Sequence, residues 1–161
     1  MSFRGYGNFY YWLKAKIEKI RYFPKEVKWF VQRGKRGYAD SDVWDFDCYL
    51  SKVVLGGLKW LQKHKHGYPA TLDPITGNFD YDMKRWEMIL QEMIDGFEIL
   101  NICIGGDDLN YGKYLPDDVK QSIETKMKIN YPNLRFTTRE EEQKIDKSFD
   151  LLKQYFLSLW D

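Results

Sequence analysis

The chain has 161 residues, a net charge of +1, 43% hydrophobic residues and 17% aromatic residues, which describes a globular chain long enough for one domain with its own core. No apolar run approaches the ~18 residues of a membrane span, and the first residues lack the apolar stretch of a signal peptide, so the sequence predicts a soluble, cytoplasmic protein.

Positive charge is concentrated at the N-terminus. Residues 1–36 hold ten Lys and Arg against two Glu, a local balance of +8, and the remaining residues therefore carry −7. Such a split is typical of a face for nucleic acid or anionic membranes. It is equally typical of a basic segment that docks on the acidic remainder of its own chain. We expect the second arrangement.

Two short helices are predicted at the start of the chain. Apolar residues recur with a helical period from Phe9 to Ile20. Pro24 suits the first turn of a second helix, which Gly34 would end. Residues 1–36 are therefore predicted to form a basic helical hairpin that packs on the rest.

A third, longer helix is predicted from the acidic cap Asp40-Ser41-Asp42 to Gly67, with a broad apolar face. Its pair Gly56-Gly57 costs about 1 kcal/mol per glycine in helix propensity relative to Ala. We expect another helix to approach closely there, and a ligand lying against the backbone is the alternative.

Three more helices follow, over residues 80–104, over residues 116–132 and after a capping box made by Thr138 and Glu141. No strand pattern of useful length is present. The predicted fold is all-α: a compact single domain of about six helices over residues 1–161, in which the third, fourth and sixth helices are long and central.

Catalytic signatures are weak. Glu92 and Asp95 match the ExxD motif with which helical nucleotide pyrophosphohydrolases of the MazG and dimeric dUTPase kind hold Mg²⁺, but the earlier acidic pair is DxxD rather than ExxE. The chain has no phosphate-binding glycine loop and no nucleophile motif. We therefore predict no catalytic residue, no metal and no cofactor, and keep Mg²⁺-dependent hydrolysis as a second alternative.

Basic and aromatic residues alternate at both ends of the third predicted helix. Arg and His side chains can neutralise phosphates, aromatic rings can stack on bases, and a carboxylate can accept hydrogen bonds from a ribose. The spacing of His64 and His66 does not suit a zinc site on a helix. The predicted ligand-binding residues are Arg33, Arg36 and His66 for phosphates, Tyr38, Trp44 and Tyr68 for stacking, and Asp42 as the acceptor.

Three segments carry a resemblance to a known family. The blocks GYADSDVWDFD (37–47), HGYP (66–69) and EMIDGFE (92–98) are similar to a pattern in small helical proteins encoded by phages and prophages. The resemblance covers about residues 33–100 and implies no particular chemistry. It implies a role in an infected or lysogenic bacterium, where small phage proteins block host defence by binding a protein or a nucleotide signal.

The first functional hypothesis is therefore a non-enzymatic protein that sequesters a phosphate-bearing nucleotide signal, such as a cyclic nucleotide or an ADP-ribose derivative. The alternative is an inhibitor or accessory factor that binds a host or phage protein. Long nucleic acids and membranes are not expected as partners. The basic charge is confined to one end of the chain, and no segment has the pattern of a DNA-recognition helix. Association of identical chains is left open.

Overall fold

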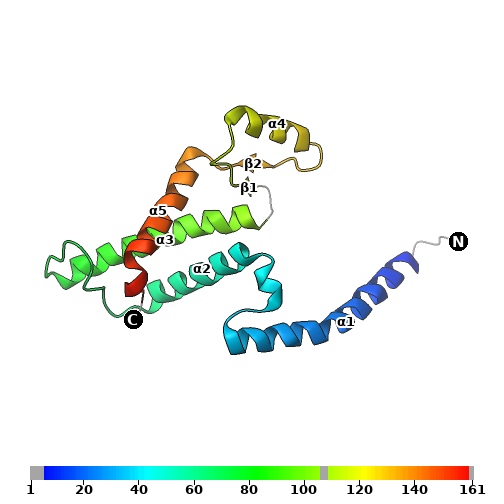
Figure 1. The fold of residues 1–161 in the computed structure, drawn as a ribbon, viewed down its shortest axis with the longest axis horizontal. Coiled ribbons are helices and arrows are strands. Elements are labelled where there is room, and N and C mark those ends of the chain that lie inside the picture. Colours follow the sequence, from blue (N-terminus) through cyan, green and yellow to red (C-terminus); the bar gives the residue numbers. More distant parts are fainter. Residues whose placement is uncertain (1–5, 106–108, 160–161) are drawn as a thin grey trace. The chain divides into compact units, whose positions relative to one another are not determined.

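The computed structural model describes residues 6–105 and 109–159. Before residue 22 it describes the backbone but not all of the side chains. These residues form five α-helices, two 3₁₀ turns and one pair of very short strands (Figure 1). Chain contacts divide the molecule into two units, residues 1–46 and residues 47–161. The all-α prediction is confirmed, but the described residues contain five helices rather than six.

The first unit consists mainly of one helix, α1 (Tyr6–Arg36). The predicted hairpin is wrong, because the helix continues through Pro24. The fixed φ of proline is compatible with a helix, so the ring removes one backbone hydrogen bond without stopping the chain. Gly37 ends the helix instead of Gly34: its φ is +84°, and its N–H donates to the carbonyl of Arg33 at 2.9 Å. Docking of this unit on the rest stays a prediction.

The predicted third helix is split in two. A 3₁₀ turn, η1 (Asp40–Val43), comes first, and α2 (Phe46–His64) begins after the turn at Trp44 and Asp45. The acidic residues that we expected to cap one long helix bond instead to side chains of α1. The helix proper is therefore shorter at both ends than predicted.

The fourth predicted helix is α3 (Phe79–Ile104), which ends where the sequence predicted. Its N-cap is Asn78, whose side chain accepts from the N–H of Tyr81 at 3.2 Å, rather than Asp80. Asp82 is fully buried in the first turn and accepts from the backbone N–H and the hydroxyl of Thr76, both at 3.1 Å. These bonds fix the preceding loop on the helix.

The C-terminal part contains α4 (Asp117–Met127), α5 (Arg139–Tyr155) and the turn η2 (Phe156–Ser158). The predicted capping box is confirmed, since Thr138 accepts from the N–H of Glu141 at 3.3 Å and donates its own N–H to the Glu141 carboxylate at 2.8 Å.

Two strands were not predicted. They are β1 (Leu109–Asn110) and β2 (Arg135–Phe136), which pair in parallel over two residues each. Thr137 extends this contact by donating its N–H to the carbonyl of Asn110 at 2.9 Å. Strands of two residues give no alternating pattern, so the sequence carries no signal for them.

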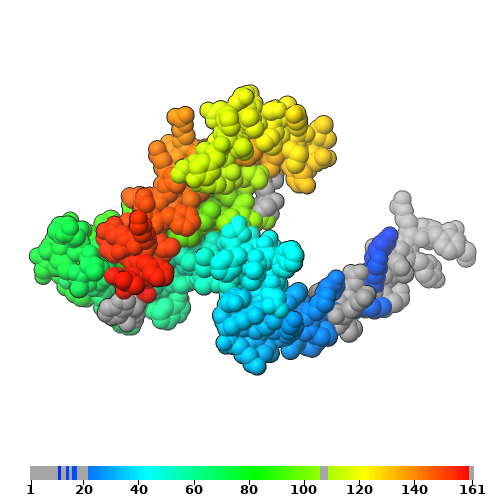
Figure 2. All heavy atoms as spheres, viewed as in Figure 1, coloured from blue at the N-terminus to red at the C-terminus, as the bar shows by residue number. Residues whose placement is uncertain are grey.

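The core of the second unit lies where α5 crosses α3. In the space-filling view the side chains of α5, orange to red, lie against those of α3, green (Figure 2). Trp86 meets Tyr155 edge-on, with ring centroids 5.2 Å apart. The buried cluster consists of Leu58, Leu61, Leu72, Trp86, Leu90, Met93, Ile94, Phe97 and Tyr155.

A glycine makes this crossing close, but it is not the one that we predicted. A Cβ atom at Gly96 of α3 would lie 2.5 Å from the carbonyl oxygen of Lys144 and from the side chain of Ser148 on α5. The expectation of close approach at Gly56 and Gly57 is wrong, since a Cβ atom there would meet nothing within 4 Å. The close contact between α3 and α5 therefore requires a small residue at position 96, whereas positions 56 and 57 of α2 have room for a side chain.

The two cysteines lie in unit 2. Cys103 is buried, and burial raises the pKa of its thiol, while Cys48 on α2 is half-buried and lies 3.4 Å from the carbonyl oxygen of Ile104. Both are free thiols. None of the described helices is long and apolar enough to cross a membrane.

Candidate functional site

Two of the predicted ligand-binding residues, Arg33 and Asp42, hold the turn after α1. The Nε of Arg33 donates to one Asp42 oxygen at 2.8 Å, and its terminal nitrogen pairs with the other oxygen. The backbone N–H of Ala39 also donates to Asp42, at 2.8 Å. These donors favour the charged carboxylate, and the guanidinium holds the pKa of Asp42 at about 2. Asp42 is therefore a structural acceptor within the turn.

Arg36 is engaged in a similar way. It pairs with Asp40, donates its Nε to the carbonyl of Tyr38 at 3.0 Å, and stacks over the Tyr38 ring at 4.5 Å. Asp40 also accepts from Gln32 at 2.7 Å and lies 3.3 Å from Lys28. Hydrogen bonds from Gln32, Arg36 and Lys28 hold the pKa of Asp40 well below its usual range. An incoming phosphate would compete with this carboxylate for Arg36.

Trp44 is the most exposed of the predicted residues, with 89% of its surface accessible. It borders a shallow hollow together with Asp40 and Val43, in the same unit as the stack of Arg36 on Tyr38. An exposed indole next to a cation–π pair is a surface on which a planar ligand can stack.

The last two predicted residues, His66 and Tyr68, belong to the second unit. Tyr68 packs against the core, with its ring 5.7 Å from that of Phe79, so it has a structural role. His66 lies exposed just beyond the end of α2. Since these residues and the turn after α1 are in separate units, a pocket that joins them stays a prediction.

The acidic pair of the hydrolase alternative lies on α3. Glu92 accepts from Lys147 of α5 at 2.7 Å, and Asp95 accepts from Gln91 at 2.6 Å. Among the residues that the structure describes, no three His, Cys, Asp or Glu side chains come together as metal ligands would.

The second unit also contains an apolar groove that the sequence did not predict. We call it the α2–α5 groove. It has two parts that share Val54 and Leu152: a hollow of about 420 Å³ that reaches α3 and a hollow of about 260 Å³ toward the C-terminus. The larger part is lined by Asp47, Leu50, Ser51, Val54, Phe97, Leu100, Ile104, Tyr111, Phe149 and Leu152, and the smaller by Val54, Gly57, Leu58, Trp60, Leu61, Leu152, Phe156 and Leu159.

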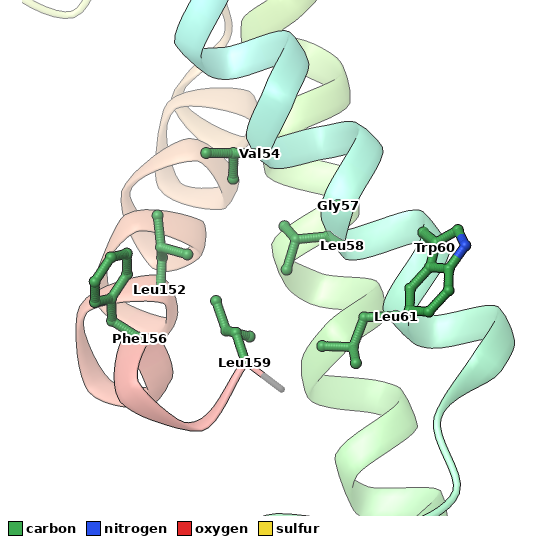
Figure 3. A pocket seen from close by; sticks show the side chains of 8 residues that line it. All are labelled: Val54, Gly57, Leu58, Trp60, Leu61, Leu152, Phe156 and Leu159. Atoms are coloured by element: carbon green, nitrogen blue, oxygen red, sulfur yellow. The ribbon is translucent and has the colours of Figure 1, made fainter. Parts of the chain in front are cut away.

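Figure 3 shows the smaller part, in which Trp60 lies on the side of α2 away from the C-terminal segment. Val54, Leu58 and Leu61 point from α2 toward Leu152 and Leu159 on the C-terminal segment. The larger part has its polar residues, Asp47 and Ser51, in the first turns of α2. Aliphatic and aromatic side chains form almost all of the remaining surface, so the groove suits an apolar ligand.

One feature of the sequence indicated this groove indirectly. The apolar face of α2 is broader than contact with a single helix requires, and it carries Gly57, which a helix interior disfavours. Leu50 on the same helix stays 47% exposed, and Phe156 after α5 stays 66% exposed. Part of the apolar face of α2 is therefore not buried in the core.

The chain was compared with protein-family models, with curated proteins and with solved structures, and none of them matches it.

Proposed function

We propose that this chain is a non-enzymatic interaction protein that binds an amphipathic helix of a partner protein in the α2–α5 groove. The observation that carries the proposal is the apolar hollow of about 420 Å³, which continues along α2 into a second hollow of about 260 Å³. Monomeric proteins rarely expose contiguous apolar surface of this kind without a binding function.

The shape of the groove fits a helix better than a small molecule. Its walls are helical, and along α2 it extends from Asp47 to Leu61, or roughly 21 Å at 1.5 Å per residue. Helix-in-groove binding uses apolar anchors at positions i, i+3 or i+4, and i+7 of the partner. Gly57 leaves room for its backbone, and Asp47 places a negative charge at one end.

The resemblance of residues 33–100 to phage-encoded proteins supports a bacterial host protein as the partner, with inhibition or recruitment of that protein as the result. The site of action would then be the host cytoplasm. The binding of one helix needs no catalytic residue, in line with the absence of a catalytic motif from the sequence.

Fluorescence anisotropy with labelled amphipathic peptides tests this proposal. The peptides carry Leu or Ile anchors at i, i+4 and i+7, with either basic or acidic polar faces. We expect the basic series to bind, and Leu50→Glu in the groove to weaken binding at least tenfold. Met88→Glu is the matched control, since Met88 is an exposed apolar residue of α3 outside the groove. Equal binding by Leu50→Glu, or no binding by any peptide, would contradict the proposal.

A nucleotide signal is the second candidate ligand, and exposed Trp44 beside the stack of Arg36 on Tyr38 supports it. A cyclic nucleotide or an ADP-ribose derivative would stack on these rings, with Arg36 transferred from Asp40 to a phosphate. In a thermal-shift panel of such nucleotides, Arg36→Ala would then remove the shift while the melting temperature of the unliganded protein stays nearly the same.

A further inference from the structure

We propose that helix α1 binds in the plane of an anionic lipid surface, with its apolar residues among the acyl chains and its basic residues at the level of the phosphates. This contact belongs to the first unit alone and does not involve the α2–α5 groove. It departs from the expectation that membranes are not partners, which treated residues 1–36 as a hairpin of two short helices. A protein bound in the groove would be held at the lipid surface.

An apolar stripe runs along the second half of α1. Phe23, Val27, Phe30 and Val31 are exposed by 63%, 44%, 76% and 44% respectively. Their spacing of i, i+4, i+7 and i+8 places them on one face of the helix, within an arc of about 100°. Helices gain most of their stability by packing such a face, so the stripe needs an apolar cover.

The first unit does not cover this stripe by itself. Apart from α1 it contains only the turn η1 and short connections. That turn is held through Asp40 by Lys28, Gln32 and Arg36, which follow one another at i, i+4 and i+8. With 3.6 residues per turn, their face lies nearly half a turn away from the stripe. The turn therefore packs on the polar side of α1.

Basic residues border the stripe on both sides. Lys28 and Lys35 lie within about 60° of one edge, and Arg33 lies within about 60° of the other. Glu26, the one acidic residue of α1 whose side chain the structure describes, shares the second edge. The long stems of Lys and Arg can follow an apolar surface while their charged ends reach the phosphates above it.

The turn neutralises only part of this positive charge. Residues 1–36 carry +8, and residues 37–46 add three Asp and no Lys or Arg, which leaves the first unit with +5. Each Lys or Arg close to an anionic lipid surface strengthens binding about fivefold. The surface that covers the stripe should therefore be negative as well as apolar.

An anionic bilayer meets both requirements better than the other candidate surfaces. The α2–α5 groove is apolar, but Asp47 is the only acidic residue in its lining, so the groove offers little to cations on both edges of the stripe. A nucleic acid would pair with the cations and leave the stripe in water. A bilayer offers acyl chains next to phosphates and needs no shaped groove.

The composition of α1 is that of a helix at a membrane interface. Its 31 residues include nine aromatic residues and nine Lys and Arg, against two Glu. Trp and Tyr favour the level of the lipid headgroups, and basic amphipathic helices lie in that plane. Among the described residues, no helix is long and apolar enough to cross a membrane. Binding of α1 along the surface is consistent with this limit.

Co-sedimentation of the full-length protein with lipid vesicles tests this inference. One set of vesicles is phosphatidylcholine with about one-third phosphatidylglycerol, and the other is phosphatidylcholine alone. We expect the wild type to bind the anionic set at least about tenfold more tightly, and this binding to weaken as the salt concentration rises. No binding to the anionic set would overturn the inference. Equal binding to both sets would also overturn it, because charge would then play no part.

Two variants with the same change of charge test the role of the stripe. Phe30→Glu puts the charge on the stripe, whereas Tyr22→Glu replaces an exposed aromatic residue that lies about 80° beyond its edge. We expect Phe30→Glu to weaken binding at least about tenfold more than Tyr22→Glu. Val27→Leu, which adds apolar area without a charge, should strengthen it. Equal losses in the two Glu variants would overturn the inference, because the attraction would then be electrostatic alone.

A different partner for α1 would give a different pattern. If the wild type binds a labelled duplex oligonucleotide and not the vesicles, the partner is a nucleic acid and the inference is wrong. If Lys35→Gln leaves binding to anionic vesicles unchanged instead of weakening it about fivefold, the bordering cations do not face the lipid, and the inference is again wrong. The vesicle assay reports on the first unit and the peptide assay on the second, so the failure of one proposal leaves the other standing.

Discussion

The two longest helices of this chain differ in what they do with their apolar residues. In α3, Trp86, Leu90 and Met93 are almost completely buried against its neighbours. In α1, the stripe formed by Phe23, Val27, Phe30 and Val31 stays exposed within its unit. Both helices are amphipathic, so the difference lies in whether a matching surface follows in the same unit.

The comparison shows how far an amphipathic pattern can be interpreted. The periodicity of apolar residues identifies each helix and the face that avoids water. It does not identify the surface that covers this face. For α3 the cover is α5, which the chain supplies in the same unit, whereas the described residues of the first unit supply no second long helix to cover α1.

The largest expected difference between the two helices comes from truncating one aromatic side chain in each. Trp86→Ala removes a buried indole that contacts Tyr155, and it should lower the free energy of unfolding by about 3–5 kcal/mol. Phe30→Ala removes an exposed ring and should change it by less than about 0.5 kcal/mol. Urea unfolding at a dilution where the protein is monomeric measures both values. A cost above 2 kcal/mol for Phe30→Ala would show that α1 is packed within the monomer.

A smaller difference should separate two glycines. Gly96→Ala places a methyl group 2.5 Å from the Lys144 carbonyl and from Ser148, and we expect a loss of about 1–3 kcal/mol as α5 is displaced from α3. Gly56→Ala meets nothing within 4 Å and should stabilise α2 by about 0.5–1 kcal/mol. Thermal unfolding should thus shift in opposite directions. The same sign for both variants would contradict the packing described here.

The parts of the fold that were predicted correctly depend on neighbouring residues. The capping box of Thr138 and Glu141 is complete within four residues, and the end of α3 at Ile104 lies directly before glycines. The parts that were missed depend on residues distant in sequence. Position 96 has no room for a side chain because Ser148, about fifty positions later, packs against it. No pattern in the residues near Gly96 predicts that contact.

The candidate site was only partly predictable for the same reason. Arg33, Arg36 and Asp42 were predicted to bind a ligand, and in the structure Arg33 pairs with Asp42 and Arg36 with Asp40. Composition alone does not distinguish a phosphate site from such internal ion pairs. The pairing of Arg33 with Asp42 requires a turn that brings positions nine apart into contact. The α2–α5 groove was missed, because the broad apolar face of α2 indicates an excess of apolar surface but not a space between the helices.

The smallest expected effect concerns the turn after α1, and it is local. Hydrogen bonds from Arg33 lower the pKa of Asp42 to about 2 from an ordinary value near 3.8. Because the folded pKa is depressed, the stabilisation is present above about pH 4 and is lost as the pH falls toward 2. The N–H of Ala39, which donates to Asp42, should report this loss as an NMR shift with a midpoint near pH 2. In Arg33→Gln the midpoint should rise toward the ordinary value; an unchanged midpoint would mean that the guanidinium does not hold the carboxylate.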